Sequence, residues 1–228
     1  MQFHVFRDAN AVAEKGAEII LAEAQLAVSV RGQFTFAVSG GQTPWRMLRT
    51  LSAKGLPWTN VSVFQVDERI APDGDPKRNL THLRESLLQH VPMRPDQIYA
   101  MPVDLPDLEA AAGLYASILE RILGSPAVLD LVHLGLGPDG HTASLVPGDP
   151  VLEVQDRDVA VTGTYEGTRR ITLTYPILNR SRRILWVITG IEKNEMLGRL
   201  RNRDATIPAG RVCPDRAIVL ADRAAAAQ

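Results

Sequence analysis

The sequence predicts an α/β protein with a mostly parallel β-sheet covered by helices. Short apolar runs, each long enough for a buried strand, alternate with amphipathic stretches along the 228 residues. Several of these runs end directly in glycine-rich or charged segments, which in open α/β sheets mark the edge where ligands bind. No internal repeat and no linker rich in Gly, Ser or Pro interrupts the pattern, so we expect a single domain over residues 1–228.

Composition restricts the classes of function. The formal net charge of −1 gives no bulk attraction to nucleic acid or to anionic lipid, so neither is an expected partner. The N-terminal residues lack a basic segment followed by an apolar core, and no apolar run reaches the roughly 18 residues that span a membrane. The single cysteine, Cys213, excludes an intramolecular disulfide and a cysteine zinc cluster. We expect a cytoplasmic protein, either a monomer or a small homo-oligomer.

Hydrophobic periodicity places the elements of the first half of the chain. We expect strands at Gln2–Phe6, Phe34–Val38 and Trp58–Val66, and helices at Ala11–Ser29, Pro44–Ser52, Asn79–Gln89 and Asp107–Leu123. Thr43 is predicted to cap the second helix and Asn79 the third, and Gly124 closes the fourth. Residues 91–106 contain four prolines and are expected to form a surface loop.

The second half repeats the alternation. We expect strands at Leu131–Leu136, Val159–Val161, Arg170–Thr174, Ile184–Thr189 and Ala217–Leu220, and helices at Tyr175–Asn179 and Glu192–Arg201. Gly163–Arg169 is predicted to be a flexible connector, and the alanine-rich tail is predicted to fray. Lys193 lies at the start of the last helix, where a cation opposes the helix dipole. A functional explanation of its position, such as neutralising a bound phosphate, is therefore more attractive than a structural one.

The segment Ser39-Gly-Gly-Gln-Thr43 joins a strand to a helix and has the composition of an anion site. Gly40 and Gly41 allow the backbone to approach a ligand, and the following helix N-terminus favours negative charge. An ordinary tight turn also favours Ser, Gly and Thr. The density of hydroxyl groups in so short a segment favours phosphate binding.

The run Gly135-Leu-Gly-Pro-Asp-Gly-His141 follows the central apolar strand and contains two side chains able to transfer protons, Asp139 and His141. We interpret it as a catalytic loop. Two alternatives stay open. The run matches the G-x-G-x-x-G dinucleotide pattern, but Pro138 removes a backbone donor and the match lies mid-chain. His141 is also compatible with an ordinary loop histidine.

Charged residues follow a second strand. Asp67, Glu68 and Arg69 come after the run that ends at Val66, and parallel pairing would place them at the same sheet edge as the glycine loops. A solvated loop is the plainer interpretation.

Four segments together resemble the 6-phosphogluconolactonase family: Ser39–Pro44, Val66–Arg69, Gly135–Leu145 and Thr189–Lys193. The resemblance covers nearly the whole chain, with the motifs in the family's order. It implies a Rossmann-like, mostly parallel sheet with helices on both faces, similar to glucosamine-6-phosphate deaminase and ribose-5-phosphate isomerase. It also implies hydrolysis of 6-phospho-D-glucono-1,5-lactone to 6-phospho-D-gluconate in the pentose phosphate pathway.

The resemblance also assigns residues. His141 matches the catalytic histidine and Lys193 the lysine that pairs with the phosphate. Arg170 matches a further ligand-facing position. The phosphate loop corresponds to Ser39, Gly40, Gly41, Gln42 and Thr43. One departure is Val146, where the family often has phenylalanine; this is a change of packing that leaves the chemistry intact.

The residue types suggest a mechanism. A lactone is an activated ester, so one positioned base is enough and no cofactor or metal is expected. We expect His141 to activate water and Asp139 to orient its imidazole. Arg69 or loop N–H groups would stabilise the oxyanion, and Asp67 would fix Arg69 or a sugar hydroxyl.

The sequence argues against two rival functions. Glucosamine-6-phosphate deaminases and related sugar-phosphate isomerases carry a glutamate shortly after the histidine, whereas Thr142–Gly148 contains no carboxylate. A non-catalytic sugar-phosphate sensor would need an output module, and none fits before Phe34. Both considerations favour hydrolysis of a phosphosugar lactone.

Overall fold

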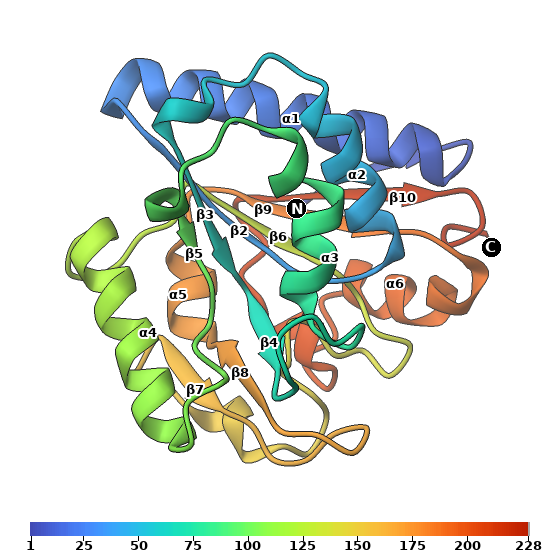
Figure 1. The fold of residues 1–228 in the computed structure, drawn as a ribbon. Helices are drawn as coiled ribbons and strands as arrows, with labels where there is room; N and C mark the ends of the chain where they lie inside the picture. Colours follow the sequence, from blue (N-terminus) through green and yellow to red (C-terminus); the bar gives the residue numbers. More distant parts are fainter. Residues whose placement is uncertain (228) are drawn as a thin grey trace.

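The computed structural model describes residues 1–227 and has a seven-stranded sheet at its centre (Figure 1). The strand order is β1-β10-β9-β6-β2-β3-β5, and every neighbouring pair is parallel. The strands are β1 Gln2–Phe6, β2 Phe34–Val38, β3 Val61–Gln65, β5 Ile98–Tyr99, β6 Leu131–Leu134, β9 Ile184–Ile188 and β10 Ala217–Asp222. Their carboxyl ends therefore share one edge of the sheet. The predicted mostly parallel sheet is confirmed.

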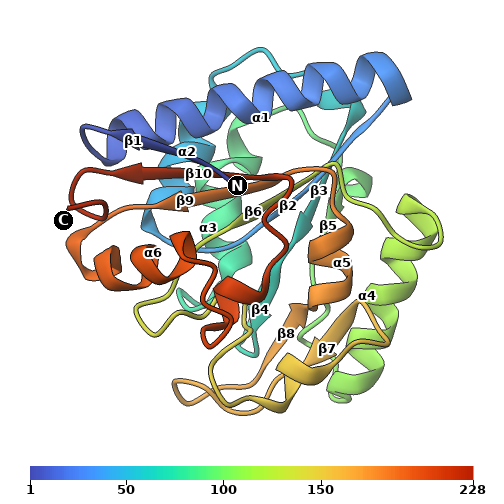
Figure 2. The same cartoon turned by 180° about the vertical axis from the view of Figure 1, so that it is seen from behind.

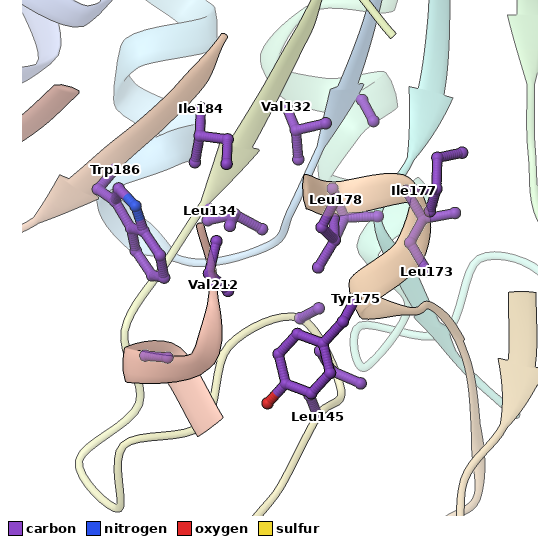
Figure 3. Close-up of a cluster of buried hydrophobic side chains, with 14 of the residues drawn as sticks. Val132, Leu134, Leu145, Leu173, Tyr175, Ile177, Leu178, Ile184, Trp186 and Val212 are labelled. Atoms are coloured by element: carbon purple, nitrogen blue, oxygen red, sulfur yellow. The ribbon is translucent and has the colours of Figure 1, made fainter. Parts of the chain in front are cut away.

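Helices cover both faces of this sheet (Figures 1 and 2). One face packs against α1 Ala9–Arg31, α2 Gln42–Ser52 and α3 Asn79–Ser86, and the other against α4 Leu108–Leu123, α5 Tyr175–Arg180 and α6 Asn194–Arg201. In β9, Leu185 belongs to the first core, whereas Trp186 belongs to the second, which also contains Leu134 and Leu178 (Figure 3). Strands buried on both faces are apolar at successive positions, which explains the unbroken apolar runs in the sequence.

A second, three-stranded antiparallel sheet lies in the order β4-β8-β7. Its strands are β4 Asp67–Arg69, β7 Val159–Val161 and β8 Arg170–Leu173. The prediction of one strand over Trp58–Val66 followed by a charged loop was therefore wrong in part. Trp58–Asn60 form a 3-10 turn, and the charged residues pair with β8. A charged strand is stable here because its buried carboxylates receive hydrogen bonds from the protein.

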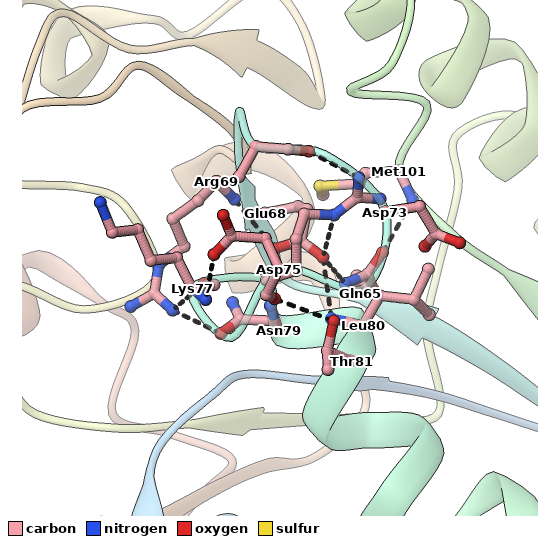
Figure 4. Close-up of polar contacts among 12 residues, drawn as sticks. Gln65, Glu68, Arg69, Asp73, Asp75, Lys77, Asn79, Leu80, Thr81 and Met101 are labelled. Carbon is pink, nitrogen blue, oxygen red and sulfur yellow. Dashed lines mark hydrogen bonds and ion pairs between the residues drawn. The ribbon is translucent and has the colours of Figure 1, made fainter.

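Glu68 is the clearest case, because its fully buried carboxylate joins β4 to the start of α3 (Figure 4). Its oxygens accept the backbone N–H groups of Asn79 at 2.7 Å and Leu80 at 2.8 Å. The Gln65 amide donates to it at 2.8 Å, and Nε of the buried Arg78 lies 3.4 Å away. Asn79 therefore does not cap α3 as predicted. An acceptor from β4 does so, and the Asn79 side chain is free for other contacts.

The start of α2 also differs from the prediction. The helix begins at Gln42, and its N-cap is Gly41, with φ 127° and ψ 160°. This backbone conformation favours glycine, and it starts the helix earlier than a Thr43 cap would. Thr43 thus lies in the first helical turn. For α4 the prediction is confirmed, because Asp107 accepts the N–H of Glu109 at 3.0 Å and Gly124 ends the helix.

Two segments expected to be irregular are ordered. The proline-rich stretch contains β5, which pairs with β3 at the edge of the sheet. In the alanine-rich tail, Ala225 is buried and its carbonyl accepts the amide of Asn194, so the predicted fraying is wrong for this part. The final residue, Gln228, lies outside the described residues. Among residues 1–227, no helix is long and apolar enough to cross a membrane.

The Glu68 network gives a stability prediction. Glu68→Gln keeps the shape but removes the charge that Arg78 faces, and breaking a buried pair typically costs about 3–5 kcal/mol. We expect the free energy of unfolding, measured by urea denaturation, to fall by about that amount. The matched control is Glu153→Gln, because Glu153 pairs with Arg211 at 3.0 Å but its side chain is 77% exposed. Similar losses in both variants would contradict the burial argument.

A buried histidine in β6 gives a pH prediction. His133 is fully buried, its Nδ1 accepts the Ser39 N–H at 3.3 Å, and burial lowers its pKa to about 3. From about pH 6.5 down to about pH 3, the unfolded chain binds a proton that the folded chain does not. Stability should therefore fall as pH falls, by up to about 1.4 kcal/mol per pH unit from this group.

The test compares urea denaturation from pH 4 to pH 7, a window of about three units in which an ordinary histidine protonates, for wild type and His133→Asn. Asparagine retains an acceptor for Ser39, so the variant should lose stability less steeply on acidification. His90→Asn, at an exposed histidine, serves as the control with the wild-type slope. An unchanged slope in His133→Asn would overturn the assignment.

Candidate active site

The loops at the carboxyl ends of β2, β6 and β9 meet β4 around a cavity of about 340 Å³. Residues from all four segments singled out in the sequence line it: Ser39–Pro44; Asp67 and Arg69; Gly135–Pro138, His141 and Ala143; and Val187–Thr189, Glu192 and Lys193. Asn79, at the start of α3, completes the wall. Parallel pairing of the strands, together with the position of β4, has thus brought the predicted residues to this cavity, except Arg170 and Asp139, the latter of which contacts His141.

The loop Ser39–Thr43 is held from three sides. Ser39 N–H donates to His133, and the Thr43 hydroxyl is hydrogen-bonded to the hydroxyl of Thr189 beyond β9. Gly40 lies against Asn79, since a Cβ at position 40 would be 2.0 Å from Asn79 Oδ1. The first N–H groups of α2 have no acceptor within the helix, so they are available to an anion in the cavity.

Lys193 lies on the same cavity wall as this loop. It ends the 3-10 turn Ile191–Lys193 after β9 and immediately precedes α6. The side chain is half-buried, and within residues 1–227 its ammonium forms no ion pair. A lysine and a set of backbone donors therefore face one space, an arrangement that suits a phosphate group.

His141 and Asp139 form a close pair. His141 Nδ1 lies 2.6 Å from Asp139 Oδ1, and the backbone N–H of His141 donates to the same oxygen at 3.1 Å. With Nδ1–H donated to the carboxylate, the unprotonated nitrogen of the neutral ring is Nε2. Gly137 lies against the ring, since a Cβ there would be 2.1 Å from Nδ1. The imidazole is 22% exposed and lines the cavity.

The Asp139 carboxyl group stays ionised. Burial raises its pKa, but the charge and N–H groups of His141 and the hydroxyl of Tyr165 outweigh burial and hold the pKa below its usual range. An ionised carboxylate both fixes the histidine tautomer and stabilises the imidazolium that forms when the ring takes up a proton.

Asp67 was expected to fix either Arg69 or a sugar hydroxyl, and within residues 1–227 no hydrogen bond or ion pair joins it directly to Arg69. Asp67 is 2% exposed, and its carboxylate accepts the Ser144 hydroxyl at 2.6 Å and the Ser39 hydroxyl at 3.3 Å. Arg69 Nη1 donates to Asn79 Oδ1 at 2.8 Å (Figure 4), while Asn79 Nδ2 donates to the Asp67 carbonyl at 2.9 Å. Asn79 is therefore the bridge between them, and the sequence suggested for it only a capping role.

Arg170 does not line the cavity. Its side chain is 3% exposed, donates to Glu166 Oε2 at 3.0 Å, and lies with its guanidinium carbon 4.9 Å from the centre of the Tyr165 ring. The ring of Tyr165 occupies the side facing His141 and Asp139. The resemblance implied that Arg170 faces the ligand. In the structure, its guanidinium lies instead beneath the ring of Tyr165.

Tyr165 itself was missed, because its segment was predicted to be a flexible connector. The only local signal is an aromatic residue within a polar, glycine-bounded stretch, which does not indicate a partner.

As for metal binding, among the described residues no three His, Cys, Asp or Glu side chains are grouped so as to hold an ion.

The chain is similar to known proteins over nearly its whole length. Residues 7–220 match the sequence model of the family described as glucosamine-6-phosphate isomerases/6-phosphogluconolactonase. A 6-phosphogluconolactonase of Nostoc sp. is 34% identical over 201 residues, which cover 86% of this chain and 83% of the relative. One from Mycobacterium tuberculosis is 35% identical over 238 residues, covering 98% and 96% respectively.

Solved structures agree with the sequence matches. The crystal structure of 6-phosphogluconolactonase from Thermotoga maritima superposes with a TM-score of 0.85 at 26% identity, covering 97% of this chain and 98% of that one. Matched in both sequence and fold, this chain belongs to the glucosamine-6-phosphate isomerase/6-phosphogluconolactonase family.

Proposed function

We propose that this protein hydrolyses 6-phospho-D-glucono-1,5-lactone to 6-phospho-D-gluconate, with His141 as the general base. The observation that carries the proposal is that His141, paired with Asp139 at 2.6 Å, lines one cavity with the Ser39–Thr43 loop and Lys193. A base and an anion site in one cavity suit a substrate that carries both a phosphate and a reactive carbonyl. The names of the relatives support this substrate.

The chemistry follows from the pair. Water attacks the lactone carbonyl carbon while His141 Nε2 accepts its proton, and Asp139 stabilises the resulting imidazolium. The negative charge that develops on the carbonyl oxygen is stabilised by Arg69 or by loop N–H groups. When the tetrahedral intermediate collapses, the carbonyl re-forms, the bond to the ring oxygen breaks, and the imidazolium returns the proton to that oxygen. The products are a carboxyl group and a hydroxyl group, and no cofactor takes part.

The remaining residues hold the substrate. Lys193 and the donors at the start of α2 bind the phosphate, with Ser39, Gly40, Gly41, Gln42 and Thr43 forming its loop. Asp67 keeps β4 in place through Ser39 and Ser144 and offers an acceptor to a sugar hydroxyl. Arg170 contributes from behind Tyr165 rather than by contact with the ligand.

The first experiment distinguishes this reaction from that of a deaminase. The lactone is generated in situ from glucose 6-phosphate, and its hydrolysis is followed above the spontaneous background in the presence of a chelator. Glucosamine 6-phosphate is tested in parallel. We expect lactone hydrolysis without release of ammonia. Ammonia release, or tight binding of phosphosugars without turnover, would replace the proposal with a deaminase or a sensor.

The role of His141 predicts the effect of His141→Asn. General base catalysis typically contributes about 10²–10⁴-fold, so kcat should fall by that factor while the fold is retained. The amide can still donate to Asp139, which limits the change to the loss of the base. His90→Asn, at an exposed histidine outside the cavity, is the control with normal kcat. A folded His141→Asn enzyme with a near-normal rate would exclude His141 as the base.

The role of Lys193 predicts a change in substrate binding. Lys193→Gln should raise KM for the phosphorylated lactone about 10- to 100-fold, because a hydrogen bond to a charged group is worth about 1.5–3 kcal/mol. Hydrolysis of unphosphorylated glucono-1,5-lactone should be unchanged by the same substitution. Lys54→Gln, which removes a surface lysine paired with Glu14, is the matched control. Equal losses on both lactones would show that Lys193 does not bind the phosphate.

A further inference from the structure

Tyr165 contacts both members of the His141–Asp139 pair. Its hydroxyl donates to Asp139 Oδ2 at 3.1 Å, while His141 Nδ1 lies against the other oxygen, Oδ1, at 2.6 Å. Its ring meets the imidazole edge-on, with 5.5 Å between ring centres and 68° between planes. The two oxygens of one carboxylate are thus divided between a histidine and a tyrosine.

A tight turn and a neighbouring arginine hold Tyr165 in place. Tyr165 and Thr168 exchange backbone hydrogen bonds of 3.0 and 3.3 Å across a tight turn, in which Glu166 and Gly167 have φ of 49° and 79°. Arg170 lies beneath the ring at 4.9 Å and is itself paired with Glu166. A stacked, buried arginine fixes the plane of the ring, and with it the direction of the hydroxyl.

We propose that Tyr165 is a positioning residue that lowers the proton affinity of His141 by sharing the charge of Asp139. This inference rests on the proposed function, because it assigns a role to Tyr165 only if His141 is the base. A carboxylate that receives a second hydrogen bond has less negative charge to offer the imidazolium. The imidazole then stays neutral, and able to accept a proton, at lower pH than it would beside Asp139 alone. The same bond keeps the carboxylate turned toward Nδ1.

The hydroxyl acts as a donor throughout the working pH range. Burial, followed by the charge of Asp139, raises the pKa of Tyr165 to about 12, so the group remains protonated. Tyr165→Phe therefore removes a neutral O–H and no charge. The other charged groups in contact with the pair or its cavity are the same in both proteins: Arg69, Asp67, Lys193, Glu192, Arg170 and Glu166. A difference in the titration of His141 between wild type and Tyr165→Phe thus reports the loss of the single hydrogen bond from Tyr165 to Asp139.

The experiment measures the titration of His141 directly and through the rate. The imidazole signals of the substrate-free protein are followed by NMR against pH and assigned with His141→Asn. In parallel, kcat/KM for the phosphorylated lactone is measured below pH 8, the side of the profile on which an ordinary histidine protonates. In Tyr165→Phe we expect the pKa of His141 and the acid limb of kcat/KM to move upward together by roughly 0.5–1 pH unit, with KM nearly unchanged.

Two further variants make the result specific. Tyr175→Phe is a matched control, because Tyr175 also donates a hydroxyl, to Pro208 at 2.9 Å, and also lies 4.9 Å from an arginine, Arg211, but outside the cavity. Tyr175→Phe should leave the pKa of His141 and the acid limb of kcat/KM unchanged. Replacement of Tyr165 by 3-fluorotyrosine preserves the shape but strengthens the donor, so it should shift His141 in the opposite direction, and it remains informative if Tyr165→Phe does not fold.

The outcomes separate the two proposals. Titration shifts of opposite sign in the two Tyr165 variants support the inference, even if the rate data disagree with lactone hydrolysis. An unchanged His141 titration in a folded Tyr165 variant overturns the inference and leaves the lactonase proposal intact. Failure of the wild-type protein to hydrolyse the lactone overturns the proposed function, whereas the NMR titration still decides whether Tyr165 acts on His141.

Discussion

Parallel pairing of β6 with β2 on one side and β9 on the other is the constraint on which the site depends. Val132 is in register with Ala37 and with Ile184, and because the three strands are parallel their carboxyl ends lie at the same edge of the sheet. The loops that follow them contain Ser39, His141 and Lys193, which are far apart in the sequence. Parallel strands require long crossover connections, and the helices of those connections bury both faces of the sheet. The pairing of the strands thus determines where the cavity forms, whichever side chains line it.

The small antiparallel sheet contributes site residues that the parallel sheet does not. β4 places Asp67 beside Ser144, in the loop that contains His141, and β8 begins just after the turn that contains Tyr165. The loops of the parallel sheet therefore contribute Ser39–Thr43, His141 and Lys193, and the second sheet contributes Asp67 and Arg69. Asn79 links the two sets, since it lies against Gly40 and also binds Arg69.

How much could be predicted from the sequence depended on whether a feature is local. The Ser39–Thr43 loop and the apolar strands have signatures within a few residues, and they were located correctly. By contrast, β4 consists of three polar residues whose pairing partner in β8 is about a hundred residues away, and no local pattern reveals it. Tyr165 was missed and Arg170 was expected to face the ligand for a different reason, because the turn at Glu166–Gly167 and the packing of the arginine against the ring, which have no sequence signature, decide where the two side chains lie.

The contact between Gly137 and His141 has a consequence for the orientation of the imidazole. The ring lies with Nδ1, Cε1 and Cγ against Gly137, and its Nδ1 meets the carboxylate of Asp139. A half-turn of the ring would place a carbon atom where Nδ1 now meets the carboxylate and would leave the charge of Asp139 without that donor. The Asp139 contact thus favours a single ring orientation, the one in which Nε2 is the nitrogen that does not face the carboxylate. A flip of the ring would break that hydrogen bond, so the carboxylate sets the orientation of the imidazole.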